Sequence, residues 1–436
     1  MNNQIRKSRI LVGRRLHQVL RQPVIVLMLL APLASAQVAL DPGESSRARH
    51  DFETRTGEEA LRCEVTPLGP VLNLAFRFQA GYLFHVPQSL YSSSNRGWVV
   101  FTAITPEDAP GDTTYLLGRS RLSDVVRVGP DFEIYGDYFL GPGRYSVEST
   151  LRDDRNGFCR KEWHVVVKQS HANRGVPVAL PPNAVRQFAA ISWPDTQHRD
   201  SAAPMRLSVL LNATAFSPRH IVIRQSDLEE IAGAFTALLE HLPTTSVRVV
   251  VFSLEQQREV FRSDRFAPSD ITRLVEAIAA LRTTAVDVSV LQNPLGHVAF
   301  LAGLIGRELN GPDPADTAVF LGPTSRYENK IPRGMVPSQG QAHTRFFYVR
   351  YETPLGIPAL RFGSTASGTD QWNGEAVGED PTLPKGYPIS KLASPPSTQG
   401  LPDIITAAVS ELKGKTLIVQ TPADLAKAIQ TIERKP

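Results

Sequence analysis

The sequence predicts two domains of different class: an antiparallel β-sandwich over residues 61–168, and an α/β domain with a doubly wound, mostly parallel sheet over residues 205–434. The first prediction rests on repeated short alternating strands separated by turn residues. The second rests on the alternation of strand and helix patterns through most of the C-terminal half, and on the apolar strand Met205–Leu211. A nearly continuous apolar strand is expected where helices cover both faces of a sheet. We therefore expect Met205–Leu211 to be the first, central strand of the parallel sheet.

The length and composition are those of a globular protein. The chain has 436 residues, of which 42% are hydrophobic and 21% are charged. This composition excludes disorder throughout the chain, and the length allows two or three domains.

Residues 1–36 have the features of a secretory signal peptide. Six basic residues and no acidic residue occur there, an apolar run covers 23–34, and Ala34-Ser35-Ala36 forms an Ala-x-Ala site. We expect cleavage after Ala36 and a secreted or periplasmic protein with no stable membrane span. An uncleaved membrane anchor is the alternative, although the run is shorter than the roughly 20 residues of a spanning helix.

Removal of that segment changes the charge of the chain. The whole sequence has 47 basic and 43 acidic residues, and loss of the six basic residues leaves 41 against 43. No long basic run remains to follow a phosphate backbone. We therefore expect no nucleic-acid partner.

The two cysteines, Cys63 and Cys159, both lie in the exported part of the chain. Two cysteines in an oxidising compartment most simply form a disulfide. Closing a loop of this length is worth roughly 4 to 5 kcal/mol in the chain-entropy model. Two buried free thiols are the alternative.

Residues 37–60 are predicted to be a flexible lead-in, and the proline-rich segment 169–204 a semi-extended linker. Between them, strands are expected at 72–78 and 145–151, where apolar residues alternate, at the β-rich run 98–104, and at 163–167, which closes the region. The run Gly141-Pro142-Gly143-Arg144-Tyr145 resembles the corner before a late strand of immunoglobulin-like and fibronectin-like domains. The resemblance implies that Tyr145 packs against the turn.

Apolar periodicity predicts a regular succession of elements after residue 211. The expected helices are 227–242, 270–281, 294–309, 403–412 and 423–432, and the expected strands are 246–252, 258–261, 286–291, 317–321, 345–351 and 416–420. Long irregular segments at 322–343 and 353–400 interrupt this order. Loops of this length inside a domain are either functional or disordered. We expect both to lie at the carboxyl ends of the strands, where parallel sheets bind ligands.

The strand that ends in Asn212-Ala213-Thr214-Ala215-Phe216, the helix after it, and the closing strand 414–419 with its helix resemble a von Willebrand factor type A domain. Residues 251–254, 291–297, 320–323 and 412–416 are similar to the divergent form found in exported acidobacterial proteins. The resemblance covers about residues 205–434.

In that family a Mg²⁺ site uses the motif Asp-x-Ser-x-Ser after the first strand and an aspartate after a later one. The matching positions here hold Asn212, Thr214 and Phe216, and Gly322 stands where the later acid belongs. A hard divalent cation needs charged oxygen donors, and both carboxylates are missing. We therefore expect no metal, no cofactor and a recognition mode that is independent of metal.

The sequence predicts a non-catalytic protein, because it contains neither a His-Glu-x-x-His nor a Gly-x-Ser-x-Gly motif. We expect its long loops to bind another protein or a cell-envelope polymer. The candidate interaction residues, of types that binding surfaces favour, are Arg326, Tyr327, Arg361, Phe362 and Trp372. Packing of these side chains onto their own domain is the alternative. Two other functions stay open: an envelope-acting hydrolase and a self-assembling structural component of the envelope.

Overall fold

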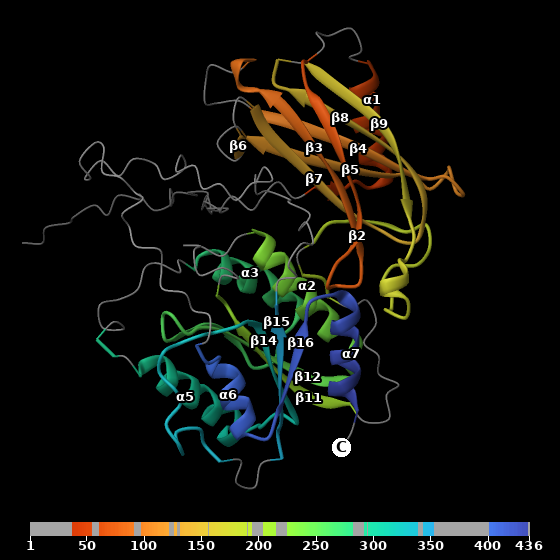
Figure 1. Cartoon of the computed structure of the whole chain (residues 1–436). Coiled ribbons are helices and arrows are strands. Elements are labelled where there is room, and N and C mark those ends of the chain that lie inside the picture. Colours follow the sequence, from red (N-terminus) through yellow and green to blue (C-terminus); the bar gives the residue numbers. More distant parts are fainter. Residues whose placement is uncertain are drawn as a thin grey trace, which may run out of the picture. The chain divides into compact units, whose positions relative to one another are not determined.

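The computed structural model describes residues 37–54, 61–90, 97–121, 126–128, 131–155, 157–189, 191–193, 204–214, 225–281, 292–293, 295–338, 343–352 and 401–434. These residues form two antiparallel sheets and one mixed sheet in which most neighbouring strands are parallel (Figure 1). The fold therefore combines antiparallel β structure with α/β structure, in the order that the sequence predicts.

The first antiparallel sheet has the strand order β1-β5-β4-β8-β9. Its strands are β1 (Val38–Ala39), β4 (Gly97–Pro106), β5 (Thr114–Arg121), β8 (Gly143–Asp153) and β9 (Phe158–Val167). The predicted strands 98–104, 145–151 and 163–167 lie within β4, β8 and β9. The alternation at 145–151 is a reliable signal because one face of this sheet is buried and the other is largely polar.

The second antiparallel sheet has the order β10-β7-β3-β2, with β6 paired to β7. Its strands are β2 (Glu64–Leu72), β3 (Phe78–Pro87), β6 (Val126–Val128), β7 (Asp131–Leu140) and β10 (Val185–Gln187), and a short 3₁₀ turn, η1 (Gln88–Leu90), follows β3. Rings from the two sheets meet in one core. The ring centroids of Trp98 and Phe132 are 5.8 Å apart, as are those of Tyr82 and Trp163.

The predicted strand at 72–78 is wrong in its middle, because residues 73–77 form a turn between β2 and β3. The side-chain oxygen of Asn73 accepts hydrogen bonds from the backbone N–H groups of Ala75, at 3.0 Å, and Arg77, at 3.1 Å. Phe76 has a positive φ of 56°. An asparagine side chain that bonds its own backbone replaces the ladder that a strand would need.

The segment 37–60, predicted to be a flexible lead-in, contains β1 and the helix α1 (Pro42–Thr54). The helix begins at a proline, and the side chain of Asp41 accepts a hydrogen bond from the N–H of Glu44 at 2.7 Å. Its apolar contact is the ring of Phe52, stacked on Phe101 of β4 with centroids 4.9 Å apart. The helix was not predicted from the sequence, because Pro42 and Gly43 indicate a turn as readily as a helix start.

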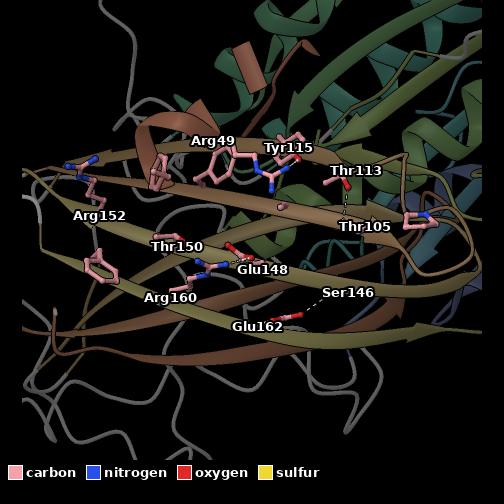
Figure 2. A pocket seen from close by; sticks show the side chains of 15 residues that line it. Arg49, Thr105, Thr113, Tyr115, Ser146, Glu148, Thr150, Arg152, Arg160 and Glu162 are labelled. Atoms are coloured by element: carbon pink, nitrogen blue, oxygen red, sulfur yellow. Dashed lines mark hydrogen bonds and ion pairs between the residues drawn. The ribbon is translucent and has the colours of Figure 1, made fainter. Parts of the chain in front are cut away.

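Helix α1 lies over the face of the first sheet that is turned away from the core. Arg49 of this helix donates a hydrogen bond to the hydroxyl of Tyr115 at 3.3 Å, and Figure 2 shows the two side chains meeting above the strands. The sheet face beside α1 carries threonine, glutamate and arginine side chains (Figure 2).

The segment predicted to be a linker pairs with the second sheet over part of its length. Strand β10 pairs antiparallel with β7, and the backbone N–H groups of Gly141 and Asn183 bond to the carbonyls of Ala184, at 2.8 Å, and Pro142, at 2.9 Å. A 3₁₀ turn, η3 (His171–Asn173), precedes them. These backbone bonds override the extended preference of the proline-rich composition.

Tyr145 packs against its turn, as the sequence predicts. Its side chain is fully buried, and its hydroxyl donates a hydrogen bond to the carbonyl of Gly141 at 2.8 Å. A buried phenol needs such a partner, since leaving it unpaired would cost about 1 to 3 kcal/mol.

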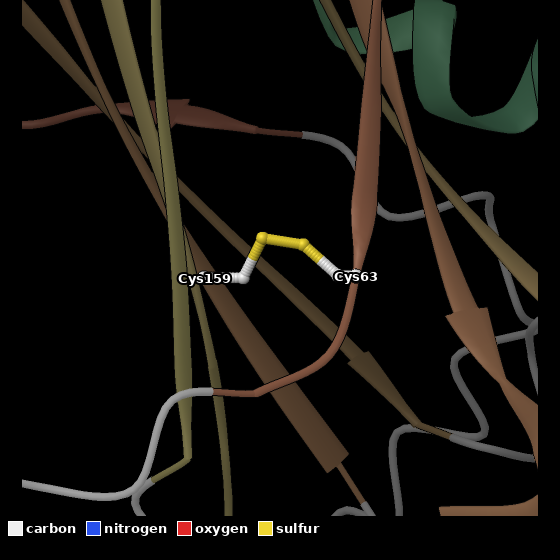
Figure 3. Close-up of a disulfide and its surroundings, with 2 residues drawn as sticks. All are labelled: Cys63 and Cys159. Atoms are coloured by element: carbon white, nitrogen blue, oxygen red, sulfur yellow. A yellow bond between two sulfur atoms is a disulfide. The ribbon is translucent and has the colours of Figure 1, made fainter.

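The predicted disulfide between Cys63 and Cys159 is confirmed (Figure 3). It joins the residue before β2, in the second sheet, to β9, in the first sheet, with Cα atoms 6.2 Å apart. The bond therefore ties together the two sheets that enclose the core, across a sequence separation of 96 residues.

The mixed sheet has the order β13-β12-β11-β14-β15-β16. Its strands are β11 (Met205–Asn212), β12 (Thr244–Ser253), β13 (Arg258–Ser263), β14 (Thr317–Pro323), β15 (Arg345–Tyr351) and β16 (Lys415–Val419). Strand β11 pairs in parallel with β12 and β14, and only β13 in this sheet pairs antiparallel. The predicted central strand thus occupies an interior position, while the predicted strand 286–291 lies outside the described residues.

Helices cover both faces of this sheet (Figure 1). They are α2 (Gln225–His241), α3 (Ile271–Ala279) preceded by the 3₁₀ turn η4 (Pro268–Asp270), α5 (Gly296–Asn310), α6 (Ile404–Glu411) and α7 (Pro422–Glu433). Leu210 packs on the side of α5 and α6, whereas its neighbour Val209 packs on the side of α2 and α7. This double burial explains the nearly continuous apolar character of β11.

Each described helix of the α/β part overlaps one that the sequence predicts. None of the helices in the described part of the chain is long and apolar enough to cross a membrane.

Candidate functional site at the carboxyl edge of the parallel sheet

The carboxyl ends of β11, β12 and β14 bring together polar side chains that are far apart in the sequence. Asn212 ends β11, Ser253 ends β12, and Ser325 follows β14. All three are buried, with exposed fractions of 0%, 0% and 3%. Parallel strands place these ends at one edge of the sheet, where α/β proteins bind ligands.

Asn212 acts as a bridge between β11 and the segment after β14. Its side-chain Nδ2 donates hydrogen bonds to the carbonyl of Pro323 at 3.2 Å and to Oγ of Ser325 at 2.8 Å. Its Oδ1 is buried and has no partner among the described residues. The donor side of the amide is therefore committed to holding the two segments together.

Gly322 lies directly against Asn212. It has a φ of +151°, and a Cβ added at this position would stand 2.9 Å from both the Cβ and the carbonyl oxygen of Asn212. A side chain of any size would have to displace the backbone of β11. This contact gives a packing reason for glycine at the position where the type A resemblance implies an acid.

The residues present do not fit the Mg²⁺ site that the resemblance implies. The side chain of Asn212 could offer a cation only the neutral oxygen Oδ1, because its N–H groups are donors, and Gly322 has neither a carboxylate nor room for one. Hard cations need oxygen donors and usually several carboxylates. Among the residues that the structure describes, no group of three or more His, Cys, Asp or Glu side chains is arranged to hold a metal ion.

Thr214 belongs to a second polar cluster at the same edge. Its hydroxyl donates to a carboxylate oxygen of Glu255 at 2.5 Å, and Ser253 donates to the other oxygen at 3.1 Å. Ser253 also accepts from the N–H of Gln256 at 3.2 Å. The carboxylate of Glu255 is thus held by two hydroxyl donors, one from the end of β12 and one from the segment after β11.

His297 and Tyr327 form a stacked pair, with ring centroids 4.1 Å apart and planes inclined by 16°. Burial lowers the pKa of His297, which favours the neutral imidazole. Burial, and then the negative charge of Glu255, raise the pKa of Tyr327 well above its ordinary value. The buried atoms His297 Nε2 and Tyr327 Oη have no hydrogen-bond partner among the described residues.

A cavity of about 430 Å³ opens beside this edge, between the segment after β14 and α6. Asp403 caps α6 by accepting from the N–H of Ile405 at 3.2 Å, and it also lies 3.7 Å from Arg350. Arg350 in turn pairs with Glu352 at 2.6 Å. The exposed side chain of Arg326 also lines the cavity, so its wall presents a guanidinium beside a compensated ion-pair network.

Several residues predicted to matter are located by the structure. Asn212, Thr214 and Gly322 lie together at the carboxyl edge, Arg326 lines the cavity, and the ring of Tyr327 packs onto His297. The other candidates, Phe216, Arg361, Phe362 and Trp372, lie outside the described residues.

Three residues of the edge were not singled out from the sequence: Glu255, Ser325 and Asp403. Each follows a strand or precedes a helix by one or two positions. That placement is the signal that a search for polar residues at strand ends could have used.

Comparison with known proteins adds little. No known family model matches the chain, and no curated protein matches it. An NMR structure of a lipoprotein from Bacteroides thetaiotaomicron is similar over 27% of this chain and 89% of its own length, with 8% sequence identity and a TM-score of 0.15. A similarity of this size carries no argument about function.

Proposed function

We propose that this chain is an exported, non-catalytic binding protein in which an immunoglobulin- or fibronectin-like β-sandwich precedes a divergent type A-like domain. The disulfide between Cys63 and Cys159 supports an oxidising, extracytoplasmic location. The mostly parallel sheet with helices on both faces supports the type A-like assignment.

The observation that carries the proposal is the bridge made by Asn212. In a type A domain the metal ion joins the loops at the carboxyl edge and completes its coordination with the ligand. Here the amide of Asn212 joins the end of β11 to Pro323 and Ser325 by hydrogen bonds. The edge is therefore held in shape without an ion, and recognition must use the side chains around it.

The cavity beside α6 supplies a surface for that recognition. Thr324 and Arg326 flank Ser325, which receives the hydrogen bond from Asn212, and both line the cavity. The positive charge of Arg350 is paired with the carboxylates of Glu352 and Asp403. Arg326 is therefore the exposed cation among the described residues in this wall of the cavity. A protein or envelope polymer with an acidic group fits this wall.

The experiment is capture of partners from detergent-solubilised envelope extract by the full mature chain, compared with the variant Arg326→Glu. Arg333→Glu is the matched control, because Arg333 is exposed in the same segment but does not line the cavity. We expect Arg326→Glu to reduce capture at least tenfold and Arg333→Glu to leave it unchanged. Equal capture by all three proteins would reject this wall as the binding surface.

The hydrolase alternative makes a different prediction. It requires acidic and histidine side chains grouped at the same edge, and in the described part of the chain Glu255 is bound by hydroxyl donors while His297 is stacked on Tyr327. Turnover of envelope polysaccharide or peptide by the mature chain, abolished by Glu255→Gln, would favour that alternative over a binding role.

A further inference from the structure

A groove runs over the outer face of the first antiparallel sheet, next to α1. It has a cavity volume of about 260 Å³ and is lined by side chains from α1, β4, β5, β8 and β9 (Figure 2). It belongs to the N-terminal β part of the chain and shares no lining residue with the cavity beside α6.

Strand alternation assigns the groove to the face opposite the core. In β4, Val100 and Ile104 point into the core, whereas Phe101, Ala103 and Thr105 line the groove. Strand register aligns these residues in rows across the sheet. Ala103 lies opposite Tyr115 and Glu148, and Glu148 lies opposite Glu162; Phe101 lies opposite Thr150, and Thr150 opposite Arg160.

The rows cross the neighbouring strands β5, β4, β8 and β9, and the groove also extends along β8. Thr150 and its neighbours Arg152, Glu148 and Ser146 on β8 all line it, and successive residues on one face are roughly 6.5 Å apart along a strand. The lining therefore extends for roughly 20 Å along β8. A lining of this length has room for several successive units of a linear chain.

Aromatic rings form one side of the groove. Phe52 of α1 stacks on Phe101 at 4.9 Å, and Phe101 stacks on Tyr115 at 5.5 Å, both with planes inclined by 21°. Phe158 of β9 is a further half-buried ring in the lining. Phe101 itself is buried, so the apolar surface open to a ligand belongs to the half-buried rings of Phe52, Tyr115 and Phe158.

The other side carries planar hydrogen-bonding groups. Arg160 pairs with Glu148 at 2.6 Å, and Ser146 donates to Glu162 at 3.2 Å. Glu148 and Glu162 are directly opposite each other on neighbouring strands. Like charges in that position repel each other, and here the charge of Glu148 is paired with Arg160, whereas Glu162 is held by the hydroxyl of Ser146.

The main chain of this face is unavailable to a ligand. The N–H and C=O groups of β4 and β8 are used in ladders with β5 and β9 and with each other. An extended peptide that binds a sheet relies on main-chain bonds at a free edge. A ligand in this groove meets side chains alone: rings, hydroxyls, guanidinium groups and carboxylates.

We propose that this groove binds a linear saccharide chain of the cell envelope. A pyranose ring presents an apolar C–H face, which suits the rings of Tyr115 and Phe158, and a rim of hydroxyl groups that suits forked acceptors and donors such as Glu162 and Arg160. The lining holds three arginines and two glutamates, so positive and negative charges nearly cancel. This charge balance favours a neutral or N-acetylated sugar over a polyanion. This saccharide site would lie in the same extracytoplasmic compartment as the proposed function, but on a different surface of the protein.

The test is a titration of the full mature chain, followed by isothermal calorimetry. The probes are purified peptidoglycan glycan strands freed of peptide, an N-acetylglucosamine hexamer and a glucose hexamer. The variants Tyr115→Ala and Glu162→Gln remove a ring and an acceptor from the groove. Lys161→Ala is the control, because Lys161 is an exposed neighbour on the same strand that does not line the groove.

We expect at least one glycan to bind, and Glu162→Gln and Tyr115→Ala each to weaken it at least tenfold, while Lys161→Ala binds like the wild type. Glu162 is exposed, so its substitution leaves folding intact and keeps the test decisive. Absence of binding to all three probes, equal binding by Glu162→Gln, or binding of the released envelope peptides in place of glycan would overturn the proposal. Arg326→Glu should leave glycan binding unchanged, which separates this result from the test of the α/β edge.

Discussion

The side chain of Asn212 joins two segments at the carboxyl edge in a way that its acidic counterpart could not. Its Nδ2 donates to Pro323 and Ser325, and the neighbouring Gly322 leaves no room for another side chain. An aspartate at this position would replace the N–H donor Nδ2 by a carboxylate oxygen, and this oxygen would face the carbonyl of Pro323. The identity of residue 212 therefore decides how the edge is held together.

Asn212→Asp tests this arrangement. We expect a loss of about 1 to 3 kcal/mol in the free energy of unfolding, because the carboxylate is buried and the donor to Ser325 is lost. The carbonyl of Pro323 loses the donor from residue 212 but keeps the one from the hydroxyl of Tyr348. Urea unfolding, followed by circular dichroism in excess Mg²⁺ and again in EDTA, measures the loss. An increase in stability of the variant with Mg²⁺ would show that the edge can form a cation site and would contradict the proposal.

The raised pKa of Tyr145 predicts how the stability of the antiparallel part changes at alkaline pH. Burial raises the pKa of its hydroxyl to about 12, against a value near 10 in the unfolded chain. A raised pKa means that the folded state keeps the proton longer. The stabilisation is therefore complete below pH 10 and is lost as the pH rises toward 12.

The free energy of unfolding should accordingly fall between pH 10 and pH 12, and the fall should be shallower in Tyr145→Phe, which cannot ionise there. At neutral pH the same variant should be less stable by about 1 kcal/mol, since the bond to Gly141 is lost. An identical pH slope in wild type and variant would show that Tyr145 does not contribute.

Among the elements, α5 is attached to the sheet by a buried ionic contact as well as by apolar packing. Glu308 of this helix is fully buried and pairs with Arg248 of β12 at 2.9 Å. It also accepts from the hydroxyl of Ser208 on β11 at 2.8 Å. The contact fixes the helix against two neighbouring strands.

Glu308→Ala should cost about 1 to 3 kcal/mol, because Arg248, whose side chain is only 12% exposed, and Ser208 both lose their buried acceptor. Arg248 keeps its ion pair with the exposed Asp264 at 3.0 Å. The double variant Glu308→Leu/Arg248→Met should be closer to the wild type, since both charges are then removed. Guanidinium unfolding of the three proteins compares them. A Glu308→Ala variant as stable as the wild type would mean that Asp264 and solvent are sufficient partners for Arg248.

The elements also show what the sequence can predict. Most of the described strands and helices of the α/β part were predicted well because they carry strong apolar patterns, such as the continuous apolar run of β11 and the helical period of α2. Helix α1 and strand β10 were missed, because contacts with distant residues hold them in place, such as the ring of Phe52 on Phe101 and the pairing of 185–187 with β7. The turn at 73–77 was missed because tertiary packing buries Leu74 and Phe76 with the spacing of a strand.

The candidate site was also predictable only in part, because it depends on contacts between residues that are distant in the sequence. The position of Asn212 follows from the end of an apolar strand, which is a local signal. Its partners Pro323 and Ser325 lie more than a hundred residues away. Their contact depends on strand order, and the groove on the first sheet depends on how α1 lies across it.

For the whole molecule, the disulfide is the covalent constraint on the antiparallel part. Replacing both Cys63 and Cys159 by alanine should reduce the free energy of unfolding by roughly 4 to 5 kcal/mol, since a loop spanning 96 residues is no longer closed in the unfolded chain. Thermal unfolding of the wild type, with and without reductant, gives an independent measure. Unchanged stability in the double variant would show that the two sheets need no covalent link.

The proposed function requires that the protein bind its envelope partner without a divalent cation. Capture from solubilised envelope extract by the mature chain should therefore be the same in Mg²⁺ and in EDTA, and should fall at least tenfold with Arg326→Glu in both conditions. Capture that disappears in EDTA and returns when Mg²⁺ is added would contradict the proposal.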